Sequence, residues 1–253
     1  MKYILMVLVL ILFVGGSSVS AKATDSDASN GIGKYLDLYL STLFYKNNDT
    51  LLKWDDHITI RMIGLPEELN PFYHMYLDYF NSKLNSDGVV IEDVESGDAD
   101  IMIVVSNDLT KTALSSNIKS LLKINSQSED DYNEEVSSYK KDGIVLKYKR
   151  FEDGARFVAL WDPLVYPARN KVERDPRFQM QRILYCALTF VPPTTKCNSL
   201  VVGKRVYGLN YLDASYMVSL YDKSIKSFAP ISEARGKILK NMVNYLSAIR
   251  KRK

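Results

Sequence analysis

The stretch Phe178–Asp222 reads FQMQRILYCALTFVPPTTKCNSLVVGKRVYGLNYLDASYMVSLYD. Its first part carries apolar side chains at helical spacing, which predicts a buried helix over Phe178–Val191. The Pro192-Pro193 pair then forces a turn, and Cys197 follows in the loop. Asn210 is placed to cap a second helix, because its side chain can accept a hydrogen bond from a free backbone N–H of the first turn. A buried helix, a cysteine-bearing loop and a capped helix therefore form the centre of the predicted fold.

Outward from this stretch, the sequence predicts a small mixed sheet with packed helices. Alternating or wholly apolar runs predict strands at His57–Ile63, Val89–Val94 and Asp100–Ser106, and an Asp-Gly turn predicts a hairpin of Ile144–Phe151 with Ala155–Trp161. Apolar residues at helical spacing predict helices over Gly33–Lys46, Pro66–Leu84 and Leu109–Ile124, and a last helix that Ser232 caps. Three helices follow the last strand, so the fold class is α+β with a C-terminal run of three helices.

The amino-terminal residues have the three parts of a secretory signal. Lys2 is followed by the apolar run Tyr3–Val14 and by small residues that offer cleavage after Ala21 or Ala23. An apolar run of 12 residues is short for a membrane helix, which needs about 20. We therefore expect a cleaved signal peptide and a periplasmic or secreted protein.

The rest of the chain predicts one domain. Residues 1–23 form the signal peptide and 24–30 a flexible lead, and residues 31–250 form a single α+β domain. Residues 125–143 are polar and charged, with Val136 as the only aliphatic residue, so we expect an exposed loop or insertion. Residues 251–253 are a basic tail.

Cys186 and Cys197 are the only two cysteines. An even count in an exported chain favours a structural disulfide between them. Closing so short a loop stabilises a fold by about 3 kcal/mol in the chain-entropy model. Two free buried thiols are the alternative, and a metal site is less favoured because two thiolates without a nearby histidine leave a zinc site half built.

Familiar catalytic and cofactor patterns are missing from the sequence. A zinc peptidase needs two histidines one helical turn apart with a glutamate between them. The central helix offers Arg182–Thr189, which holds neither histidine nor carboxylate, and the only histidines, His57 and His74, lie far upstream. No G-x-S-x-G elbow and no glycine-rich phosphate loop occurs. The sequence therefore assigns no catalytic residue, no metal ligand and no cofactor.

Net charge argues against a nucleic-acid partner. The formal charge is +3, and Arg250–Lys253 alone contribute +4. The remainder has no general positive field that would hold a polyanion.

Several short segments resemble a bacterial exported family catalogued as domain of unknown function 2927. They are Lys53-Trp54 with His57–Ile63, Ala99–Val105, Leu209–Asp213, Ser219–Asp222 and Ile231–Arg235, so the resemblance covers Leu51–Arg235. It implies a zincin-like α+β fold without an established activity. Many members carry E-x-x-Q-x-L-G-L on the helix where a protease has H-E-x-x-H. The matching segment here is Leu184–Val191, which lacks the Glu, Gln and Gly.

The function expected from these observations is non-catalytic: an exported, metalloprotease-like domain that binds another cell-envelope component, a protein or a polymer, without stable membrane insertion. One alternative is a hydrolase with an unorthodox site, built from His57 or His74 with carboxylates such as Asp98 and Asp100. A second alternative is an anionic-surface binder that acts through the basic tail Arg250–Lys253.

Overall fold

The structure is a computed structural model of the 253-residue chain. It describes residues 25–43, 49–124, 129–137, 143–151, 154–165, 174–191 and 209–251. The predicted signal peptide, Cys197 and the last two residues of the basic tail lie outside the described residues.

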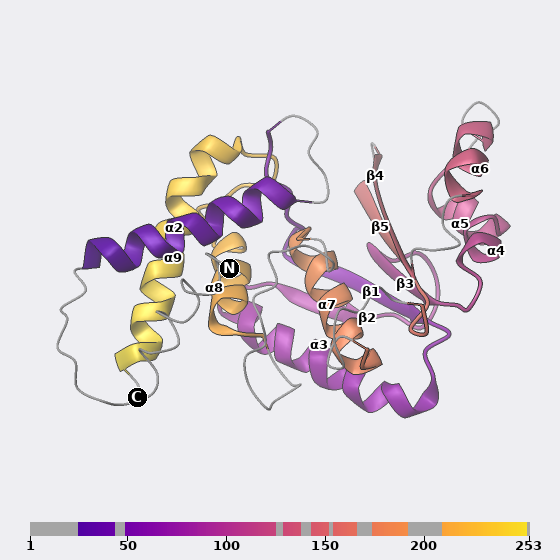
Figure 1. The fold of residues 1–253 in the computed structure, drawn as a ribbon, viewed down its shortest axis with the longest axis horizontal. Coiled ribbons are helices and arrows are strands. Elements are labelled where there is room, and N and C mark those ends of the chain that lie inside the picture. The colour runs from indigo at the N-terminus through magenta and orange to yellow at the C-terminus, as the bar shows by residue number, and fades with distance from the viewer. Residues whose placement is uncertain are drawn as a thin grey trace, which may run out of the picture.

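A five-stranded mixed sheet forms the centre of the fold (Figure 1). The strands are β1 (His57–Ile63), β2 (Val90–Asp93), β3 (Ile101–Val105), β4 (Ile144–Phe151) and β5 (Gly154–Trp161), in the order β2-β1-β3-β5-β4. Strands β2, β1, β3 and β5 are parallel, and β4 pairs with β5 in antiparallel register as the predicted hairpin. The prediction of a mixed sheet with packed helices is confirmed.

Helices cover both faces of this sheet. They are α2 (Asp25–Thr42), α3 (Asn70–Leu84), α4 (Leu109–Ala113), α5 (Ser116–Leu121), α6 (Glu129–Ser137), α7 (Pro176–Thr189), α8 (Tyr211–Leu220) and α9 (Ile231–Lys251); the short 3-10 turns Glu67–Leu69 and Asn85–Asp87 flank α3. The last three follow β5, as the sequence predicts. None of the helices in the described ranges has the length and apolar character to span a bilayer.

Strand β3 shows why the two faces hold separate cores. Side chains alternate between the faces of a strand, so Ile101 and Ile103 join the larger core with α3, α7 and α8. Met102 and Val104 join a smaller core with α4, α5 and α6. A strand that is apolar on both faces lies inside a covered sheet, and β3 is the central strand.

Helix α6 lies within the segment that the sequence analysis assigns to an exposed loop. Tyr132 and Val136 are spaced one helical turn apart, and both are buried in the smaller core. The hydroxyl of Tyr132 also donates to the backbone carbonyl of Ala113, at 3.0 Å. Two apolar residues are enough to hold α6 in place, because the sheet face on which they pack is apolar.

Two helix starts also differ from the sequence expectation. Helix α2 begins at Asp25 and thus includes the segment 25–30, which the sequence assigns to a flexible lead. Helix α9 begins at Ile231, so Ser232 lies inside its first turn and the prediction of a Ser232 cap is wrong. The N–H groups of Glu233 and Ala234 donate instead to the carbonyl of Pro230.

A side-chain amide protects the outer edge of β2. Val90 and Val94 donate their N–H groups toward β1, so the backbone of Ile91 points outward. Asn81 on α3 donates to the Ile91 carbonyl at 2.9 Å and accepts from the Ile91 N–H at 2.7 Å. The amide thus replaces a neighbouring strand and blocks edge-to-edge pairing at this point.

We predict that Asn81→Ala lowers the free energy of unfolding by about 1–3 kcal/mol, because it leaves the N–H and the carbonyl of Ile91 without their partner. Urea unfolding measures this. The neighbouring Ser82→Ala change removes an exposed hydroxyl and should stay within about 0.5 kcal/mol. Equal effects of the two substitutions would contradict the role of the amide.

Candidate functional site

Helix α7 carries the segment Leu184–Val191, which the sequence analysis compares with the ligand-bearing helix of a zinc peptidase. Asp175 caps its start by accepting from the backbone N–H of Arg177, and Pro176 occupies the first helical position. The helix packs on β5 and contacts α3 and α8 (Figure 1). Eleven of its 14 residues are buried. Nearly the whole circumference of α7 therefore faces protein.

Side chains from distant segments close the C-terminal end of α7. The last carbonyls of a helix have no partner within the helix. The indole N–H of Trp54 donates to the Ala187 carbonyl at 2.7 Å, and the Tyr221 hydroxyl donates to the Leu188 carbonyl at 2.8 Å. Both donors are buried. This end of the helix is thus satisfied by the protein itself.

Phe190 ends the helix in a left-handed conformation, with φ of 59°. Its ring stacks on Trp54 with a centroid distance of 5.5 Å and meets Tyr148 at 5.2 Å and Phe157 at 6.3 Å. The residue is 2% exposed. Left-handed backbone costs a non-glycine residue about 1–3 kcal/mol, and the aromatic packing offsets that cost.

Phe190 stands at the position where the resembling family has a glycine. Leu184 and Leu188, one turn apart on the same helix, are fully buried in the apolar core. The side chains of the segment Leu184–Val191 therefore pack in the interior of the protein. Within the described part of the chain, no group of three or more His, Cys, Asp or Glu side chains is arranged to hold a metal ion.

A buried carboxylate links α2, α7 and α8. Asp213 in the first turn of α8 accepts a hydrogen bond from the Tyr39 hydroxyl at 2.6 Å, and its backbone carbonyl accepts one from Tyr185 at 3.2 Å. The rings of Tyr39 and Tyr216 stack at 4.8 Å. Burial, and secondarily the charge of Asp213, raises the pKa of Tyr185 well above its ordinary value. A tyrosine held protonated in this way anchors helices and does not serve as a base.

Sequence reasoning missed this cluster. It identified Asn210 as the cap of α8, and the structure confirms that the Asn210 side chain accepts from the Asp213 N–H at 2.9 Å. Tyr39 is 174 residues away from Asp213. The only signal in the sequence was that Asp213 is a carboxylate among apolar helical residues. This pattern does not indicate which residue donates a hydrogen bond to it.

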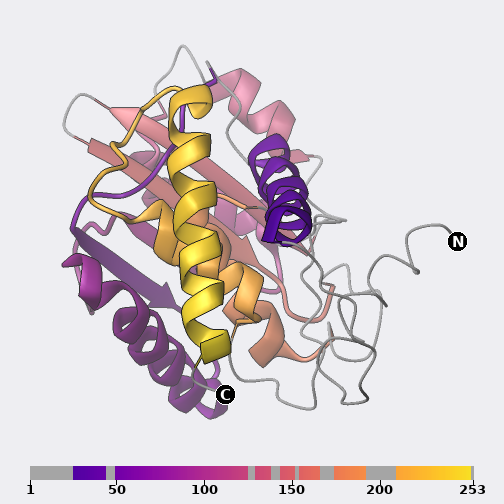
Figure 2. The ribbon, with the colours of Figure 1, turned by 90° about the vertical axis from the view of Figure 1, so that its left-hand side faces the viewer.

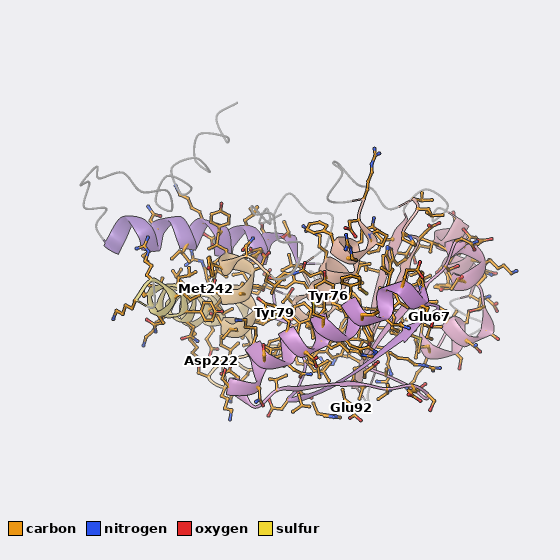
Figure 3. The ribbon with its side chains drawn as sticks, turned by 90° about the horizontal axis from the view of Figure 1, so that it is seen from below. Glu67, Tyr76, Tyr79, Glu92, Asp222 and Met242 are labelled. Atoms are coloured by element: carbon orange, nitrogen blue, oxygen red, sulfur yellow. The ribbon has the colours of Figure 1, made fainter. Side chains whose placement is uncertain are left out.

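The two histidines lie on opposite faces of the sheet edge. The His57 ring nitrogen Nε2 is 2.9 Å from an oxygen of Glu92, and His74 Nδ1 is 3.9 Å from an oxygen of Asp93. Glu92 and Asp93 are consecutive on β2, so their side chains point to opposite faces. Figure 3 shows Glu92 at the margin of the molecule. The structure thus separates the two histidines.

Asp100, one of the two carboxylates proposed for an unorthodox site, has other partners. Asp100 accepts from both the backbone N–H and the hydroxyl of Thr59, at 2.9 and 2.7 Å, and lies 3.6 Å from Arg156. Asp98 is exposed. The His57–Glu92 contact has the length of an acid–base pair, but the two side chains are 60% and 55% exposed. The pair is thus largely exposed to solvent and is not enclosed in a cleft by the described residues.

Cys186 lies fully buried on α7, and burial raises the pKa of a thiol at this position. A thiol held protonated is a poor nucleophile. Its predicted disulfide partner, Cys197, lies outside the described residues, so the bridge stays a prediction.

Two glutamines on α7 have contrasting environments. Gln179 is 1% exposed, and its carbonyl oxygen accepts from the Trp161 indole N–H at 2.8 Å. Gln181 is 2% exposed, and neither its amide nitrogen nor its oxygen has a hydrogen-bond partner among the described residues. Burying an unpartnered amide costs free energy, so Gln181 is a weak point of the helix.

We predict opposite outcomes for the same substitution at these positions. Gln181→Met should raise the free energy of unfolding by about 1 kcal/mol, because it removes the unpartnered amide. Gln179→Met should lower it by about 1–3 kcal/mol, because the Trp161 N–H then loses its acceptor. Thermal and urea unfolding of both variants measure the difference in the free energy of unfolding. Destabilisation by Gln181→Met would contradict the prediction, because it would show that the Gln181 amide stabilises the fold.

Comparison of the chain with protein-family models, with curated proteins and with solved structures found no match. The resemblance drawn from short sequence segments therefore remains a proposal, and the site is interpreted from its own geometry.

Proposed function

We propose that the chain is an exported, non-catalytic binding domain with a zincin-like fold, and that it binds another component of the cell envelope. The mixed sheet with its packed helices supports this proposal, because the resemblance implies an α+β fold.

The closed end of α7 is the observation that carries the proposal. The last carbonyl groups of α7 accept hydrogen bonds from Trp54 and Tyr221. The ring of Phe190 stacks on Trp54 at the same end of the helix. A metal-activated water would need polar ligands and an open coordination position there. The aromatic side chains fill that region instead, which favours binding over hydrolysis.

The surface that best suits a partner lies where the parallel strands end. Ligands of open sheets with parallel strands bind outside the carboxyl ends of the strands. Here Leu164 is 88% exposed and Val165 is 48% exposed, directly after β5 and before α7. Asp162 fixes this turn by accepting from the Leu164 N–H at 2.9 Å. Two exposed aliphatic side chains on a fixed turn suit an apolar protein segment.

The hydrolase alternative rests on the 2.9 Å contact between His57 and Glu92. Hydrolysis of a peptide or ester substrate that His57→Ala abolishes would favour it over the binding proposal.

Metal analysis tests the non-catalytic proposal directly. We expect the purified mature chain, residues 24–253, to contain no stoichiometric zinc after gel filtration, because α7 offers apolar side chains where ligands would stand. Tightly bound zinc at one equivalent per chain would overturn the proposal.

A matched pair of substitutions tests the binding surface. We predict that Val165→Lys weakens cross-linking to the envelope partner about tenfold, because it places a charge in an apolar contact. Val90→Lys adds the same charge at an equally exposed valine, at the amino end of β2, and should leave cross-linking unchanged. Equal loss in both variants, or in neither, would contradict the placement of the surface.

A further inference from the structure

Helix α9 continues beyond its last fully buried side chain. Its 21 residues contain three buried side chains, Ala234, Ile238 and Met242. Nine residues follow Met242, which at 1.5 Å per residue is about 13 Å of helix, and none of them is buried. Figure 2 shows α9 at the front of its view along its whole length, and Figure 3 labels Met242.

The apolar stripe of α9 continues along this extension. Val243, Leu246 and Ile249 follow one another at three-residue spacing, so they lie on one side of the helix. All three are half-buried. Leu239 packs against the large core, whereas the three later residues are not members of that core among the described residues. The apolar stripe of α9 thus continues past the residues that belong to the large core.

The charges of this part of the chain have one sign. From Ala234 to the C-terminus the sequence contains seven basic residues and no acidic one: Arg235, Lys237, Lys240, Arg250, Lys251, Arg252 and Lys253. Arg235 is paired with Asp37 through two hydrogen bonds, and Lys237 lies 3.4 Å from Glu233. Lys240, Arg250 and Lys251 have exposed side chains.

We propose that Val243–Lys251 is an amphipathic attachment helix that binds an anionic lipid surface. Basic residues at a helix C-terminus also favour the helix dipole, but the dipole does not require an apolar stripe beside them. Apolar and basic side chains together match the boundary between acyl chains and anionic headgroups. The attachment is peripheral, and it uses a surface separate from the Leu164–Val165 turn.

Co-sedimentation of the mature chain with vesicles tests the proposal. We expect binding to vesicles with about one third phosphatidylglycerol and none to pure phosphatidylcholine, since each basic residue near an anionic surface adds to the affinity. Binding should fall when the salt is raised from about 0.1 M to about 0.5 M, because the charges are then screened.

Three variants separate the contributions. Arg250→Gln with Lys251→Gln should reduce partitioning about 30-fold, the effect of two surface charges. Ile249→Ser should reduce it about threefold or more through the lost apolar burial. The control, Lys111→Gln with Lys226→Gln, removes two exposed lysines elsewhere and should bind as the unchanged chain does.

Equal binding to both vesicle types would overturn the proposal, as would an equal loss in the control. Binding to soluble polyglutamate that matches binding to anionic vesicles, with no effect of Ile249→Ser, would assign the surface to an acidic polymer and would also overturn the lipid proposal.

Discussion

The burial of α7 is the constraint on which the other parts of the structure depend. Eleven of the 14 residues of α7 are buried, so most of its polar groups depend on partners within the protein. Gln179 finds the Trp161 indole, and the carbonyls of Ala187 and Leu188 find Trp54 and Tyr221. These donors come from the segment before β1, from β5 and from the end of α8, so satisfying α7 fixes the positions of three remote parts of the chain.

The same constraint shapes the chemistry of the region. Aromatic side chains supply both the donors and the packing at the end of α7, and Phe190 accepts a left-handed backbone to complete the cluster. A core of this kind is rigid because its contacts are numerous and mutually dependent.

Polar interactions at the periphery serve assembly in a similar way. The Asn81 side chain hydrogen-bonds the outward-facing backbone of Ile91 on β2, as a neighbouring strand would. Asp213 accepts a hydrogen bond from Tyr39 and so connects α8 to α2. The bidentate pair of Asp37 with Arg235 also joins α2 to α9. The two proposed binding surfaces use other parts of the structure, the turn after β5 and the end of α9.

Local patterns in the sequence were sufficient for the strands, for most of the helices and for the α+β class. Alternation predicted β1 with its observed bounds, the run Asp100–Ser106 predicted the central strand Ile101–Val105, and the Asn210 cap predicted the start of α8. Each of these signals depends on residues that are close together in the chain. The buried contacts of Tyr132 and Val136 escaped prediction, since two apolar residues in a charged segment gain helical order only from the sheet face below them. The partners of Asp213, His57 and Asp100 were likewise decided by tertiary structure. Their contacts join residues 174, 35 and 41 positions apart, and no local pattern encodes such a distance.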